Sequence, residues 1–229
     1  MTLTPRETLD RQLKKLNDEI LLLSSMVIQA TIDAVDSLKN RDLNKAQRTY
    51  DGDQKINAKR FEIENTVMIL IATQQPMGRD VRFLASVFEI SNELERMGDY
   101  AKGIARICLM MADQPPIKPI MDIPRMCEAT VAMLERAITA FTTNDVALAH
   151  EIPREDDYVD GLYDQVMRVL ITYMISDPTV INRSNYLIWA AHNLERMADR
   201  VTNICERTIY VVTGEMKELK NSDDELDQA

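Results

Sequence analysis

A six-residue pattern of Leu-Glu-Arg-Met, a small residue and Asp occurs twice in this sequence, at residues 94–99 and 194–199. The two copies are 100 residues apart at every position. On a helix, a Glu and an Asp four residues apart lie on the same face, where their like charges destabilise the helix by roughly 0.2–0.5 kcal/mol. The same unfavourable pair at one fixed offset indicates a chain built from two similar halves, each with a reason to keep its acids.

The composition is that of a helical protein. The 229 residues include only 6 glycines and 5% aromatic residues, whereas 45% are hydrophobic. Leu, Met, Ala, Glu and Arg are abundant, and these residues favour helices over strands. Near the N-terminus, apolar side chains recur at alternating spacings of four and three residues, which predicts one long amphipathic helix. They are Leu9, Leu13, Leu16, Ile20, Leu23, Val27, Ala30, Ala34 and Leu38.

Local signals mark where helices begin and end. The Thr-Pro-Arg-Glu segment that begins at Thr4 is a capping box with Pro at the first helical position. Asp42 is placed to cap the next helix. We expect the Asp-Gly-Asp segment at residues 51–53 to interrupt the second helix of the first half, as Pro153 interrupts its counterpart in the second half. Gly214 is a plausible end for the last helix.

These signals predict an all-α fold of two tandem, internally repeated antiparallel three-helix bundles. The first bundle is expected over residues 1–112 and the second over residues 120–214. Between them, residues 113–119 contain three prolines and predict a semi-rigid linker. The acidic residues 215–229 are expected to form a flexible tail.

Charge and motif content exclude several classes of function. The net charge is −10 and no run of Lys or Arg is present, which argues against direct contact with nucleic acid or an anionic membrane surface. The three cysteines show no paired spacing and are expected to be reduced and buried. No charge-free stretch reaches the ~20 residues of a membrane-spanning helix. The first residues contain no apolar segment, so we expect no secretory signal. We therefore expect a cytoplasmic protein that reaches a membrane only through partners, and without a nucleotide-binding or hydrolase motif we expect no enzymatic activity.

Acidic residues also recur on the second helix of each half, at an offset of 103 residues. If neighbouring helices bring these pairs together, their oxygens would suit Mg²⁺, Mn²⁺ or Ca²⁺, and a nearby His would also admit Fe or Zn. The candidate metal ligands are Asp53, Asn57, Glu95 and Asp99 in the first half and Asp156, Asp160, Glu195, Asp199 and His192 in the second. Asn92 would add one further ligand in the first half.

A plainer interpretation stays open for the same residues. Acidic pairs on exposed helix faces are commonly solvated or held in ion pairs, and Arg96 and Arg196 each lie three residues before the motif Asp. In that interpretation the acids serve solubility, and the small residues Gly98 and Ala198 serve helix contact.

The two motif copies and their spacing resemble the PhoU family of phosphate-signalling regulators. The resemblance includes the Gln-Gln-Pro turn at residues 74–76, the stretches at residues 52–57 and 155–160, and the Asn-Ile-Cys-Glu ending at residues 203–206. It covers nearly the whole chain, from the first helix to Gly214.

The resemblance implies a cytosolic, non-enzymatic adaptor that restrains phosphate uptake and the phosphate-starvation response. It implies partnership with the ATPase subunit of the phosphate ABC transporter and with a sensor histidine kinase, as well as homodimer formation. It also implies metal binding through Glu/Asp-x-x-x-Asp motifs, which fall on Glu95 and Asp99, on Glu195 and Asp199, and on Asp156 and Asp160. Asp53 and Asn57 match only partly, so the second half is expected to bind metal more tightly.

Two alternatives to the adaptor remain. One is a carboxylate-rich metal-binding bundle with a storage or enzymatic role. The other is a PhoU paralogue that acts in dormancy or polyphosphate control.

Overall fold

A computed structural model describes residues 4–112, 114–115 and 122–219, and all regular secondary structure in that part of the chain is helical. The all-α prediction is therefore confirmed. The first half consists of α1 (Pro5–Asn40), α2 (Leu43–Gln74) and α3 (Arg79–Met110). The second half consists of α4 (Asp122–Thr143), α5 (Val146–Glu151), the 3₁₀ helix η1 (Ile152–Glu155), α6 (Asp156–Ser176), the 3₁₀ helix η2 (Pro178–Val180) and α7 (Ile181–Thr213).

The predicted helix ends are formed by the expected residues. Thr4 and Glu7 make the reciprocal hydrogen bonds of a capping box at the start of α1. Asp42 accepts a hydrogen bond from the Lys45 backbone N–H at the start of α2. Gly214 ends α7 with φ of 80°, in the left-handed region that glycine adopts without strain.

The expected interruption of the first half at Gly52 is wrong. α2 continues without a break through this residue. Glycine in a helix interior weakens the helix by about 1 kcal/mol but keeps its backbone N–H, so the long packed helix around it continues. Pro153 has no N–H to donate, and here the chain does break into α5, η1 and α6.

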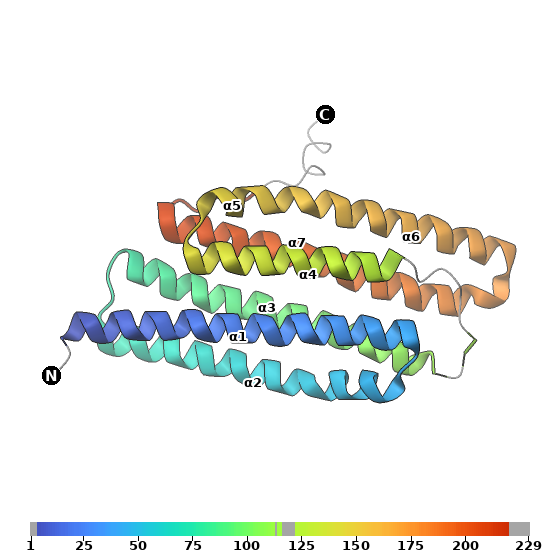
Figure 1. The fold of residues 1–229 in the computed structure, drawn as a ribbon, viewed down its shortest axis with the longest axis horizontal. Helices are drawn as coiled ribbons and strands as arrows, with labels where there is room; N and C mark the ends of the chain where they lie inside the picture. The colour runs from blue at the N-terminus through green and yellow to red at the C-terminus, as the bar shows by residue number, and fades with distance from the viewer. Residues whose placement is uncertain (1–3, 113, 116–121, 220–229) are drawn as a thin grey trace.

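The two halves pack side by side, with α3 and α7 meeting at the centre of the molecule (Figure 1). Small residues allow this approach: a Cβ added at Gly103 on α3 would lie 3.2 Å from Nδ2 of Asn193 on α7. Arg200 of α7 also pairs with Glu93 of α3 at 3.5 Å. The helices that carry the two repeated motifs are thus in direct contact.

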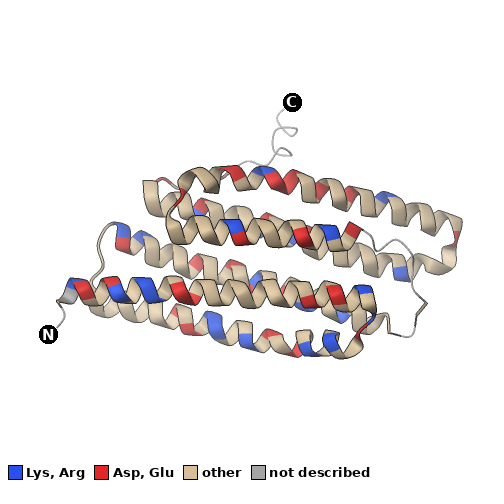
Figure 2. Ribbon diagram, in the orientation of Figure 1, with Lys and Arg blue, Asp and Glu red and all other residues tan. Residues whose placement is uncertain are grey.

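Charged residues of both signs occur along the helices of both halves (Figure 2). By length and composition alone, α1 is long and apolar enough to cross a membrane, as are core helices of many soluble proteins. Of its apolar 18-residue stretch, 44% is buried inside the molecule. Leu16, Ile20 and Leu23 of α1 are fully buried in the hydrophobic core. The expected burial of the cysteines is confirmed for Cys108, Cys127 and Cys205, which form no disulfide.

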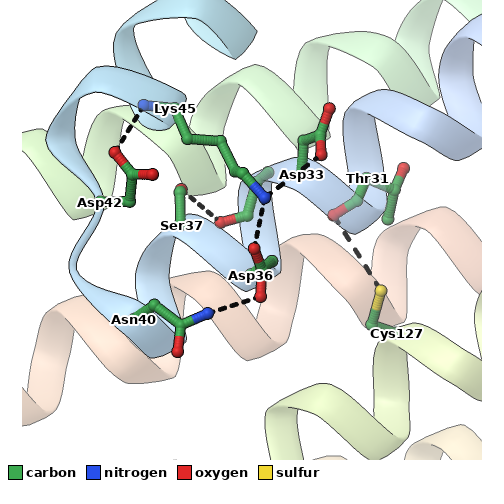
Figure 3. Close-up of polar contacts among 9 residues, drawn as sticks. Thr31, Asp33, Asp36, Ser37, Asn40, Asp42, Lys45 and Cys127 are labelled. Atoms are coloured by element: carbon green, nitrogen blue, oxygen red, sulfur yellow. Dashed lines mark hydrogen bonds and ion pairs between the residues drawn. The ribbon is translucent and has the colours of Figure 1, made fainter.

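Polar contacts tie α1 to its neighbours (Figure 3). The Lys45 ammonium of α2 pairs with Asp36 of α1 and lies 3.7 Å from Asp33. On the other side of α1, the Cys127 thiol of α4 faces the Thr31 carbonyl oxygen. The start of α2 and the face of α4 are therefore both held against the C-terminal part of α1.

Most of the predicted linker and part of the predicted tail lie outside the described residues. The described residues at the start of the predicted linker are anchored by hydrogen bonds. Arg41 donates to the carbonyl oxygens of Ala112 and Gln114, and Arg183 donates to that of Pro115. The Leu219 N–H donates to Glu206 at 2.8 Å. The exact division into residues 1–112, 113–119, 120–214 and 215–229 stays a prediction.

Candidate functional site

The acids of the first half lie where α2 and α3 pack closely. A Cβ added at Gly98 would lie 3.1 Å from two side-chain carbons of Ile56, so the glycine lets the two helices approach. Asp53 and Asn57 of α2 are thereby placed next to Glu95 and Asp99 of α3, and the charge of Asp53 acts on both of these acids. The structure brings together the four residues that the repeat singled out.

A lysine is part of this first cluster. Asp53 is 3% exposed, and its Oδ2 accepts a hydrogen bond of 2.7 Å from Nζ of Lys102. The same oxygen accepts a second hydrogen bond of 3.1 Å from the Asn57 amide nitrogen. The Lys102 ammonium also lies 3.9 Å from Oδ1 of Asp99. The first cluster, which we call the Asp53 cluster (Asp53, Asn57, Glu95, Asp99 and Lys102), thus contains its own cation.

The pKa values of the Asp53 cluster follow from burial and from these charges. Burial raises the pKa of Glu95, and the charge of Asp99 raises it further. Burial and then the charge of Asp53 raise the pKa of Asp99, while Lys102 acts in the opposite direction. The hydrogen bond to Asp53 raises the pKa of Lys102, which keeps the ammonium charged.

The second half forms a more acidic cluster between α6 and α7, which we call the Asp156 cluster (Asp156, Asp160, Glu195 and Asp199). Asp156 is fully buried. Burial, followed by the charges of Asp160, Asp199 and Glu195, raises the pKa of Asp156 to about 7. Burial and the charge of Asp199 also raise the pKa of Glu195. Three acids that each penalise the ionisation of a buried fourth are an arrangement that a bound cation would relieve.

Other side chains border the Asp156 cluster. Nδ1 of His192 lies 3.1 Å from Oε2 of Glu195, but the His192 side chain is 53% exposed. Arg196 pairs with Asp199 at 3.2 Å, as the plainer interpretation expected. Thr202 is 6% exposed, and its Oγ1 makes no hydrogen bond to any residue that the structure describes.

The two clusters differ in their fitness for a metal ion. Within the described ranges, no three His, Cys, Asp or Glu side chains are grouped as a ready-made metal site. The four acids of the Asp156 cluster offer carboxylate oxygens, the ligands that Mg²⁺ and Mn²⁺ prefer, and their side chains would have to rotate to close around an ion. The Asp53 cluster does not fit a metal, because an ammonium and an amide N–H already donate to its buried carboxylate.

The structure differs from the sequence-based prediction at Asn92 and Lys102. Asn92 was considered as a further ligand, but its amide oxygen accepts a hydrogen bond of 3.1 Å from Arg60. The role of Lys102 was missed. A signal was present, because the same 100-residue offset that aligns the motifs sets Lys102 opposite the uncharged Thr202.

The fold and its two clusters define a class of protein: an internally duplicated helical bundle with a carboxylate-rich cluster in each half. A family model described as the PhoU domain matches residues 20–108 and again residues 123–208. The chain belongs to the PhoU family. The double match also supports the internal duplication inferred from the repeated motif.

Relatives match over most of their lengths. The chain is 33% identical over 206 residues to the phosphate-specific transport system accessory protein PhoU homolog of Aquifex aeolicus, covering 90% of this chain and 93% of that protein. It is 31% identical over 204 residues to the Escherichia coli phosphate-specific transport system accessory protein PhoU, covering 89% and 85%.

Solved structures agree in fold. The phosphate transport system regulatory protein PhoU from Streptococcus pneumoniae superimposes with a TM-score of 0.85 at 29% identity, covering 92% of this chain and 100% of the other. PhoU from Pseudomonas aeruginosa gives a TM-score of 0.85 at 30% identity, covering 90% and 99%. The predicted fold of two tandem helical bundles is confirmed.

Proposed function

We propose that this protein is a cytoplasmic, non-enzymatic regulator of phosphate homeostasis that restrains phosphate uptake and the phosphate-starvation response. The observation that carries this proposal is the match of both halves to the PhoU domain, together with relatives named as phosphate-specific transport accessory proteins. The regulator acts as an adaptor between the ATPase subunit of the phosphate ABC transporter and a sensor histidine kinase, and it forms a homodimer.

The outer face of α2 offers a surface for a protein partner. Phe61, Met68 and Ile69 are all more than half exposed, at 57%, 58% and 51%. Large apolar side chains gathered on one exposed helix favour protein contact over solvent. We assign the ATPase subunit to this face.

The Asp156 cluster serves as the metal site of the proposed regulator. Asp156, Asp160, Glu195 and Asp199 would hold a hard divalent cation, Mg²⁺ or Mn²⁺, and His192 would join only by turning from its exposed position. A bound cation would neutralise the mutual repulsion of the four acids and stabilise the packing of α6 against α7.

A phosphate-starvation promoter reporter tests the regulatory role. The host lacks its own copy of the regulator, grows in phosphate-rich medium and carries either this gene or a variant. The wild-type gene is expected to silence the reporter, and Glu195→Gln with Asp199→Asn is expected to leave it partly on. Asp164→Asn, an exposed acid on α6 outside the cluster, is the matched control and should silence it fully. A reporter left on by the wild-type gene would instead indicate a paralogue with another task.

A binding assay tests the adaptor mechanism. Purified ATPase subunit and the cytoplasmic part of the kinase are each offered to the immobilised protein, with and without Mn²⁺. We expect Phe61→Asp with Met68→Asp to weaken ATPase binding at least tenfold, because it places two charges on the apolar face of α2. Ile175→Asp, at an apolar site near the end of α6 that is 79% exposed, is the control. Failure of both partners to bind the wild-type protein would refute the adaptor role.

A further inference from the structure

The two halves place different residues at one corresponding position beside their acids. Lys102 follows Asp99 by three residues on α3, and Thr202 follows Asp199 by three residues on α7. Residues three and seven positions apart lie on the same face of a helix, so both side chains belong to the face that carries the motif acids. The repeat therefore exchanges a cation for a neutral hydroxyl at an otherwise matching position.

The geometry around Lys102 is that of a cation held by a site. Its ammonium donates at 2.7 Å to the buried Asp53 and lies 3.9 Å from Asp99. Its Nζ also lies 5.6 Å from the centre of the Tyr50 ring, whose face attracts positive charge. Two carboxylates and an aromatic ring thus surround the ammonium from α2 and α3.

Asn57 completes the difference between the halves. At the position corresponding to Asp160, this residue turns its amide nitrogen toward Asp53 and donates at 3.1 Å. A divalent ion at Asp53 would be repelled by the ammonium, and the Asn57 amide would have to turn to offer the ion its oxygen. The Asp156 cluster has Asp160 and Thr202 at these two positions.

We propose that the Lys102 ammonium permanently takes the place of a divalent cation in the Asp53 cluster, so that only the Asp156 cluster binds metal. This inference rests on the metal site in the proposed function and adds the residue that makes the two halves unequal. Metal concentration then controls the second half alone, and the first half keeps its packing whether or not metal is present.

Exchange of the two corresponding residues tests the proposal. Metal-free wild-type protein, Lys102→Thr and Thr202→Lys are dialysed against Mn²⁺, and bound metal is counted by mass spectrometry. We expect about one ion per chain for wild type, about two for Lys102→Thr, and none for Thr202→Lys. Because Lys102→Thr could unfold the first half, Asp53→Asn and Asp156→Asn are measured in the otherwise wild-type chain. The first should keep the bound ion and the second should lose it.

The outcomes separate this inference from the proposed function. Two ions bound by wild type, or loss of the only ion in Asp53→Asn, would overturn the role of Lys102. If wild type binds no metal, the metal site proposed for the Asp156 cluster fails. In that case a gain of one ion by folded Lys102→Thr, judged by circular dichroism, would still support the inference, and no gain would overturn it.

Discussion

The burial of Asp156 predicts a pH-dependent cost of folding that Asp156→Asn should remove. The pKa of Asp156 is about 7 in the folded chain against an ordinary value of 3.8. Since each pH unit between the two values corresponds to about 1.36 kcal/mol, ionising this buried carboxyl costs the folded state about 4 kcal/mol. A raised carboxyl pKa means that the folded state holds the proton more tightly, so the stabilisation by protonation is complete below pH 3.8. It is lost as the pH rises to about 7.

The assay is urea denaturation between pH 4.5 and 8.5 in the presence of EDTA. The free energy of unfolding of Asp156→Asn, minus that of wild type, should rise by up to about 1.4 kcal/mol per pH unit and level off above about pH 7. Subtraction removes the contributions of all other titrating groups that the substitution leaves alone. Asp164→Asn, which removes an exposed acid of α6 outside the cluster, is the control. A difference that does not vary with pH would refute the argument from burial.

Three further predictions concern stability, measured by thermal and urea unfolding. Lys102→Met should destabilise the protein by about 2 kcal/mol, because it leaves the buried Asp53 carboxylate without its cation. The loss is smaller than for a fully buried ion pair, since Lys102 is one-third exposed. An unchanged melting temperature would contradict this. Gly98→Val should cost about 2 kcal/mol by forcing α3 away from Ile56, whereas equal stability would mean that α2 shifts freely. Thr4→Ala should cost about 1 kcal/mol through loss of the capping box, and Thr4→Ser should restore it.

The fold was predictable because its signals are local or repeated. Apolar spacing, the caps at Thr4 and Asp42, and the 100-residue offset all report on structure within one helix or on the duplication. Gly52 misled the prediction because glycine weakens a helix without forbidding it, whereas Pro153 removes a hydrogen-bond donor and breaks it.

The candidate site was predictable in its members and not in its balance of charge. Repetition selected the acids on all four helices, and the structure brings them together in two clusters. The hydrogen bond from Lys102 to Asp53 and that from Arg60 to Asn92 join residues 49 and 32 positions apart. Their formation depends on helix spacing and on how far each side chain reaches across it. Sequence spacing along one helix carries no information about either.

The direct packing of α3 on α7 has a mechanical consequence. Close-packed helices do not deform continuously, so a rotation of α7 that accompanies any event at the Asp156 cluster displaces α3 as well. Tyr100 of α3, one residue after Asp99, raises the pKa of Arg196, which itself pairs with Asp199. The two halves are therefore mechanically coupled, and neither can move at this interface without displacing the other.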